Sequence, residues 1–156
     1  MTKSDTPGVI APPPLIYLGF LATGWAIERF VRDVTFGLPD RWGAFIGISL
    51  VVIGFMIEGE ATMRFRRANT AVQPWKPSSS LVTEGIYGLS RNPIYVGMAA
   101  IYAGLALTFD APLALALLIP CLFVIDRGVI AREEPYLEAR FDQAYRDYRA
   151  RVRRWL

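Results

Sequence analysis

The chain has 156 residues, a hydrophobic content of 53% and a formal net charge of +3. A water-soluble domain of this length would leave much apolar surface uncovered, so the composition favours a membrane protein. The sequence contains no histidine and one cysteine, Cys121. These counts exclude zinc sites built on histidine, Ser-His-Asp triads, histidine general bases and disulfide frameworks.

Four hydrophobic segments predict four membrane-spanning helices. Pro12, Pro13 and Pro14 fit the start of the first, because prolines are tolerated where helix amides lack partners. The second is followed by arginines that can reach the membrane interface. The last two are short enough to be core helices of a soluble protein, but the turn at 108–111 favours a tight membrane hairpin, and Pro120 is expected to kink its second arm. The spans are expected at residues 9–27, 42–63, 94–107 and 112–127.

The distribution of positive charge predicts the orientation in the membrane. Thirteen of the seventeen Lys and Arg lie in residues 64–91 and 127–156, and the turn at 108–111 has none. Cytoplasmic segments of membrane proteins are enriched in Lys and Arg, so both termini are expected to face the cytoplasm. The loop at 28–41 also holds arginines, which its acidic residues offset. We expect a single domain, residues 1–156, in which 73–80 is a loop between two helical halves.

A first polar cluster, LVTEGIYGLSRNPIYVG at residues 81–97, leads into the third span. Its glycines permit a tight backbone, and a helix start that follows Ser90 or Asn92 offers amide donors to an anion. Arg91 adds a positive charge, and the Tyr95 ring can pack against a flat base or a cation. The alternative is a capped membrane helix with an interfacial tyrosine.

A second polar cluster occupies residues 132–152. Glu133 and Glu134 follow the fourth span directly and could bind an ammonium group or be solvated charges. The remaining residues predict an amphipathic helix with a basic side that lies on anionic lipid headgroups. Its apolar face consists of Leu137, Phe141, Tyr145, Tyr148 and Val152, a spacing that is also typical of a packing surface.

Together the two clusters resemble the isoprenylcysteine carboxyl methyltransferase family and its phospholipid methyltransferase relatives. The shared patterns are LVTxGxYxxxRxPxYxG, a membrane hairpin, and EExxLxxxFxxxYxxYxxxV, which cover Leu81 to Val152. The resemblance implies an all-α polytopic membrane bundle with about four transmembrane helices and a C-terminal amphipathic cytosolic helix. It also implies that membrane helices and the cytosolic tail enclose S-adenosylmethionine without a Rossmann domain.

The resemblance assigns roles to individual residues. Arg91 or a backbone amide is expected to take the cofactor's carboxylate and Glu133 or Glu134 its amino group, with Arg91 and Glu134 as the catalytic pair. The sequence departs from the family at Asn92, where histidine is usual, at Asp142, where glycine is usual, and after Val152, where a proline-bearing tail is usual. The implied cofactor-binding residues are Gly85, Tyr87, Arg91, Asn92, Pro93, Tyr95, Gly97, Glu133 and Glu134.

The expected function is therefore S-adenosylmethionine-dependent methylation of a lipid-like acceptor that enters from the bilayer, most like isoprenylcysteine carboxyl O-methylation. Alternatives are N- or S-methylation of a phospholipid or small molecule, an NADPH-dependent reductase of the membrane sterol type, and a non-enzymatic membrane interaction protein. We expect a bacterial inner-membrane location with the cofactor site facing the cytoplasm, and neither a metal ion nor a nucleic acid as a partner.

Overall fold

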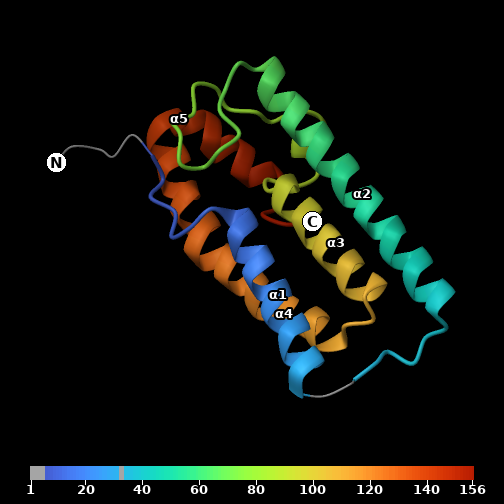
Figure 1. Cartoon of the computed structure of the whole chain (residues 1–156). Coiled ribbons are helices and arrows are strands. Elements are labelled where there is room, and N and C mark those ends of the chain that lie inside the picture. The colour runs from blue at the N-terminus through green and yellow to red at the C-terminus, as the bar shows by residue number, and fades with distance from the viewer. Residues whose placement is uncertain (1–5, 32–33) are drawn as a thin grey trace.

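The computed structural model describes residues 6–31 and 34–156, and within this part all regular structure is helical (Figure 1). Residues 32–33, inside the charged loop expected at 28–41, lie outside the described part. The helices are α1 (Pro13–Val31), α2 (Asp40–Arg67), a 3-10 helix η1 (Gly85–Gly88), α3 (Pro93–Thr108), α4 (Pro112–Ile125), a π-helix η2 (Asp126–Ile130) and α5 (Ala131–Arg151). The predicted all-α bundle with a C-terminal helix is confirmed.

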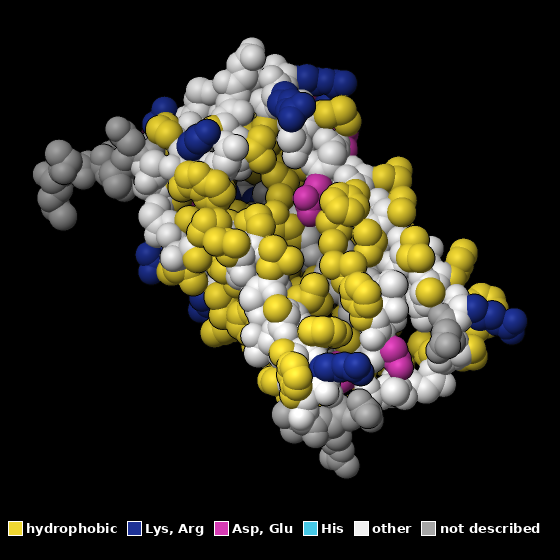
Figure 2. Space-filling view, viewed as in Figure 1, with side chains coloured by type: hydrophobic (Ala, Val, Ile, Leu, Met, Phe, Trp, Pro, Cys, Tyr) yellow, Lys and Arg dark blue, Asp and Glu magenta, His cyan; other side chains and the backbone are white. Residues whose placement is uncertain are grey.

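The four apolar helices pack as two pairs. α3 lies along α2 and α1 lies along α4, and α3 also contacts α4 and α1 (Figure 1). α2 and the helix that begins at Pro112 are long and apolar enough to cross a membrane, whereas α3 is a shorter apolar helix. Hydrophobic side chains cover much of the visible face of this bundle (Figure 2). Such a surface suits contact with lipid rather than water.

α1 begins at Pro13 and continues to Val31, so the predicted first span of residues 9–27 is displaced towards the N-terminus. The residues before Pro13 remain outside the helix, and the Ile10 amide bonds to the Gly128 carbonyl oxygen at 3.3 Å. At the other end, the buried side chain of Glu28 accepts a hydrogen bond from the Leu113 amide at 3.0 Å. Glu28 therefore satisfies a free donor at the start of α4 instead of entering a loop.

Glycines bring the backbones of α2 and α3 close together. A Cβ atom at Gly47 would lie 2.5 Å from the Gly104 carbonyl oxygen, and one at Gly54 would lie 2.7 Å from the Gly97 carbonyl oxygen. Neither approach leaves room for a side chain. Small residues allow the same close packing in other membrane helices. This packing fixes the start of α3, where the first polar cluster lies.

α4, η2 and α5 form one continuous helical path from the apolar bundle into a polar segment. The path bends sharply at Asp142, whose φ of 45° and ψ of −120° are not helical. The last part of α5 therefore turns back towards the start of α3 (Figure 1). There Tyr145 and Tyr148 pack with Tyr87 and Ala61 in a buried cluster. The bend brings the end of the sequence next to the first polar cluster.

Candidate functional site

A pocket lies where the loop after α2, the start of α3 and the start of α5 meet. It has a cavity of about 110 Å³. Among the predicted site residues, those that line it are Tyr87, Arg91, Asn92, Tyr95, Glu133 and Glu134. Two clusters about forty residues apart in the sequence thus face one cavity.

The other three predicted residues lie beside the pocket rather than in its wall. Pro93 is the buried first residue of α3. Gly85 has a φ of 63°, which favours glycine, and packs against the Arg64 guanidinium. Gly97 faces α2, where a Cβ atom would lie 2.7 Å from Glu58 Cγ.

Arg91 lines the pocket and carries two unpaired donors. Its side chain is 10% exposed, and its Nη2 atom lies 2.9 Å from Glu134 Oε1. The buried Nε and Nη1 atoms have no hydrogen-bond partner among the described residues. Buried polar groups are nearly always paired, so these two donors indicate a site for an anion.

Glu133 lines the same pocket as Arg91. Its carboxylate has no arginine or lysine partner in the described part of the chain. Its Oε1 atom accepts a hydrogen bond of 2.7 Å from the Tyr95 hydroxyl. The carboxyl is surrounded by protein atoms, although the cavity leaves part of its surface accessible. Burial raises its pKa to about 7, with a smaller rise from neighbouring Glu134 and an opposing effect of the Tyr95 bond. Glu133 can therefore be neutral or charged near physiological pH.

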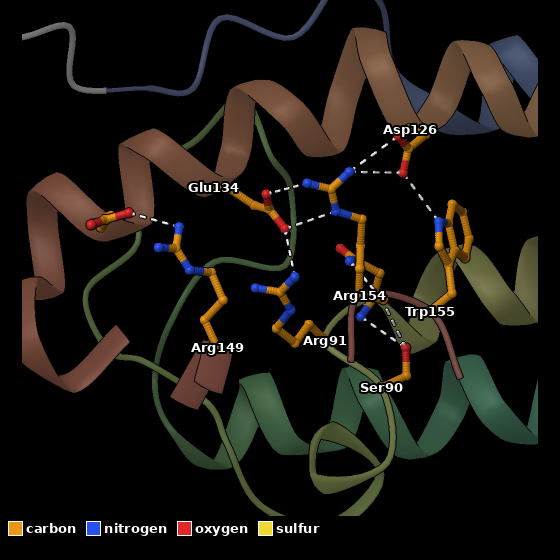
Figure 3. Close-up of polar contacts among 9 residues, drawn as sticks. Ser90, Arg91, Asp126, Glu134, Arg149, Arg154 and Trp155 are labelled. Carbon is orange, nitrogen blue, oxygen red and sulfur yellow. Dashed lines mark hydrogen bonds and ion pairs between the residues drawn. The ribbon is translucent and has the colours of Figure 1, made fainter. Parts of the chain in front are cut away.

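Glu134, by contrast, is fully engaged with arginines (Figure 3). Besides Arg91, it pairs with Arg154, whose Nε lies 3.0 Å from Oε1 and whose Nη2 lies 2.5 Å from Oε2. Arg154 Nη1 also donates to Asp126 at 3.1 Å, and the Trp155 indole donates to Asp126 at 3.1 Å. Arg154, Asp126 and Trp155 were missed by sequence reasoning, because no motif spacing links residues that only the bend at Asp142 brings together.

Tyrosines form an aromatic wall of the pocket. The Tyr148 hydroxyl donates to the Tyr87 carbonyl oxygen at 2.7 Å, which ties α5 to η1. The rings of Tyr145 and Tyr148 meet edge to face at 6.3 Å between centroids. Burial raises the pKa of Tyr145 to about 12 and also raises the pKa of Tyr148. These side chains stay protonated near neutral pH and serve as rings and donors, not as bases.

The loop after α2 covers the pocket. Residues 71–74, 78 and 80–82 line its wall, and the Ser78 amide donates to the Tyr136 hydroxyl at 3.0 Å. Pockets for small molecules commonly measure ~300–1,000 Å³, whereas this cavity measures about 110 Å³. A ligand of nucleoside size therefore requires the pocket to widen.

Comparison with known proteins identifies related chains. A family model described as phospholipid methyltransferase matches residues 42–144. Protein-S-isoprenylcysteine O-methyltransferase B of Arabidopsis thaliana is 24% identical over 132 residues, which are 81% of this chain and 67% of the relative. An uncharacterized protein of Haemophilus influenzae is 40% identical over 63 residues, which are 40% of this chain and 100% of the relative. No solved structure matches.

The family match covers more than half of the chain and includes both polar clusters up to residue 144. It agrees with the resemblance that the two motifs carry and with the apolar helices. The chain therefore belongs to the phospholipid methyltransferase family and is an integral membrane methyltransferase.

Proposed function

We propose that the chain uses S-adenosylmethionine to methylate the polar head of an apolar, lipid-like acceptor. The observation that carries this proposal is that two groups of opposite charge line one pocket, and each has hydrogen-bonding capacity that is not used. Arg91 offers two unpaired donors, and Glu133 offers a carboxylate without a cationic partner among the described residues. An amino acid end, with a carboxylate and an ammonium group, complements both.

The residues present fit this cofactor. Arg91 would donate to the carboxylate through Nε or Nη1, and Glu133 would hold the ammonium group in its charged form. The tyrosine wall offers ring faces to a cation or a flat base. When bound, the cofactor supplies a methyl group that its sulfonium already activates. Glu134, occupied by two arginines, would orient Arg91 rather than bind the ammonium group.

The chain's own residues would then act mainly by alignment and by excluding water. The loop at 71–82 covers the pocket, and Tyr136 holds it through the Ser78 amide. A carboxylate acceptor needs no base, whereas an amine or thiol must lose a proton. Without histidine, with tyrosines that remain protonated and with Glu133 assigned to the cofactor's ammonium group, carboxyl O-methylation is favoured over methylation of amines or thiols.

The acceptor is proposed to enter from the bilayer, since the pocket adjoins a bundle whose surface is apolar. The arginines of α5 are proposed to contact anionic lipid headgroups, with the site on the cytoplasmic side of a bacterial inner membrane. Arg140, Arg149, Arg151 and Arg153 are exposed on this helix and the segment after it.

Two measurements test the proposal. Calorimetry on detergent-purified protein should detect binding of S-adenosylhomocysteine, with NADPH as the comparison ligand. No heat at millimolar S-adenosylhomocysteine would overturn the cofactor assignment. Purified protein should also transfer a tritiated methyl group from S-adenosylmethionine to extracted bacterial lipids. Methyl esters release tritiated methanol in base, whereas methylated amines and thioethers do not, so base treatment of the product separates carboxyl methylation from the alternatives.

A further inference from the structure

Arg154 is not part of the pocket wall, but its guanidinium binds two carboxylates, those of Glu134 and Asp126. Its guanidinium meets Glu134 through Nε at 3.0 Å and Nη2 at 2.5 Å, and it meets Asp126 through Nη1 at 3.1 Å and 3.2 Å. Figure 3 shows Glu134 between the guanidinium groups of Arg154 and Arg91. Arg154 therefore contacts the site through Glu134 and not through the cavity.

The segment that carries Arg154 is attached to the start of α3. The Arg91 amide donates to the Arg153 carbonyl oxygen at 2.9 Å, and Asn92 Nδ2 donates to the Arg154 carbonyl oxygen at 2.9 Å. The Trp155 indole donates to Asp126 in the π-helix. These bonds fix the Arg154 backbone and side chain relative to Arg91, so the surrounding structure holds the contact between Arg154 and Glu134 in place.

The contacts of Glu134 are unequal. Arg154 engages both of its carboxylate oxygens in a paired arrangement, whereas Arg91 reaches only Oε1, through Nη2. Arginine and carboxylate groups prefer two parallel hydrogen bonds when both oxygens are free. Without Arg154, the Glu134 carboxylate could turn to Arg91 and take a second donor. One of the two donors that are now unpaired, Nε or Nη1, would then be lost to a ligand.

We propose that Arg154 is a positioning residue that keeps Glu134 from pairing with Arg91 through both oxygens. Arg91 thereby stays anchored by one contact and keeps two donors for the anionic group of a ligand. This inference rests on the proposed function, because the ligand in question is the carboxylate of the cofactor. Asp126 supports Arg154 from the other side of the guanidinium through an ion pair.

The test compares the affinity of four detergent-purified variants for S-adenosylhomocysteine by calorimetry. Arg154→Gln should bind about ten- to a hundredfold more weakly than the unmodified chain, because Glu134 is released onto Arg91. Arg151→Gln, which removes an exposed arginine bonded only within α5, should bind normally. Arg154→Lys keeps the charge but lacks a fixed fork, so it should also bind weakly and carries the test if Arg154→Gln does not fold.

The fourth variant, Arg154→Gln with Glu134→Gln, separates this mechanism from a general structural role. It removes the carboxylate that would capture Arg91, so affinity should rise above that of Arg154→Gln, while staying below that of the unmodified chain because Arg91 has also lost the contact that orients it. Normal binding by a folded Arg154→Gln or Arg154→Lys protein would overturn the proposal, as would no recovery in the double variant. If the unmodified chain itself binds no S-adenosylhomocysteine, it is the proposed function that fails.

Discussion

Glu133 and Glu134 are neighbours in the sequence but have different partners in the structure. Successive residues of a helix point in directions about 100° apart, so Glu133 meets the Tyr95 hydroxyl while Glu134 meets Arg91 and Arg154. The sequence motif favours Glu134 as the catalytic partner of Arg91 but leaves open which of the two carboxylates takes the cofactor's amino group. The fold divides them into a carboxylate that is available to a ligand and one that holds an arginine in place.

The affinity for S-adenosylhomocysteine should therefore depend on pH through Glu133. Its pKa is raised to about 7, chiefly by burial, and a ligand ammonium group binds the charged carboxylate. Affinity should rise about tenfold between pH 6 and pH 8, as the free protein loses this proton. Calorimetry across this range measures the effect. In Glu133→Gln, affinity should be low and nearly independent of pH, and an unchanged pH profile in this variant would assign the titration to another group.

The free energy of unfolding of the ligand-free protein should fall as the pH rises, whereas the affinity for the ligand should rise. Because the folded-state pKa of Glu133 is raised from 4.5 to about 7, the folded chain binds this proton more tightly than the unfolded chain. The resulting stabilisation is fully present below about pH 4.5 and is lost as the pH rises to about 7. Thermal unfolding in detergent should show this fall, and Glu133→Gln should reduce its slope.

Asp142 occupies a backbone conformation that favours glycine, with φ of 45° and ψ of −120°. Its exposed side chain pairs with Arg146. Asp142→Gly should relieve about 1–3 kcal/mol of strain, which exceeds the loss of an exposed ion pair and the added freedom of the unfolded chain, each about 1 kcal/mol or less. A higher melting temperature is expected. Asp147→Gly is the matched control, since glycine within the regular part of α5 should lower stability by about 0.3–0.5 kcal/mol relative to aspartate.

The interface of α2 and α3 depends on glycines at particular positions. A Cβ atom at Gly54 would lie 2.6 Å from the Ile101 side chain and 2.7 Å from the Gly97 carbonyl oxygen, whereas one at Gly59 would meet nothing within 4 Å. Gly54→Ala should therefore lower stability by about 1–3 kcal/mol through overpacking. Gly59→Ala on the same helix should be neutral or stabilising. Melting temperatures in detergent compare the two, and equal shifts would contradict the role of this contact.

The helices that lie in the apolar bundle could be predicted from the sequence, because hydrophobic runs and flanking prolines are local signals. α3 and α4 begin at Pro93 and Pro112, close to the expected residues 94 and 112. The bend at Asp142 could not be predicted, since aspartate gives no sign of a positive φ. The contact of Arg154 with Asp126 depends on that bend, so the candidate site was predicted without the residues that organise Glu134.

At the scale of the whole molecule, the pocket and the arginines of α5 lie at one end of the bundle. The loop after α2, the start of α3 and α5 meet there, while the turn between α3 and α4 lies at the opposite end (Figure 1). Apolar side chains such as Phe55, Met56 and Ile119 are exposed between the two ends. This arrangement suits a bundle that crosses the bilayer with its pocket at one membrane surface.

The orientation of the bundle can be tested by cysteine labelling. Ser79, in the loop after α2, and Ala150, near the end of α5, are exposed, as is Phe109 in the α3–α4 turn. Each would be replaced by cysteine in a Cys121→Ala background, which removes a buried thiol. Because thirteen of the seventeen Lys and Arg accompany the first two positions, these are expected on the cytoplasmic side.

An impermeant maleimide should therefore label Ser79→Cys and Ala150→Cys only in inside-out vesicles, and Phe109→Cys in intact cells. Lysed cells provide the control that all three thiols can react. If Ser79→Cys and Ala150→Cys were labelled in intact cells and Phe109→Cys only in inside-out vesicles, the bundle would be inverted. The pocket would then open away from the cytoplasm, which is the compartment where the proposed cofactor is made. Labelling of Ser79→Cys and Ala150→Cys on opposite sides would be more serious. It would contradict the meeting of α5 with the loop after α2, and with it the joint pocket of Arg91 and Glu133.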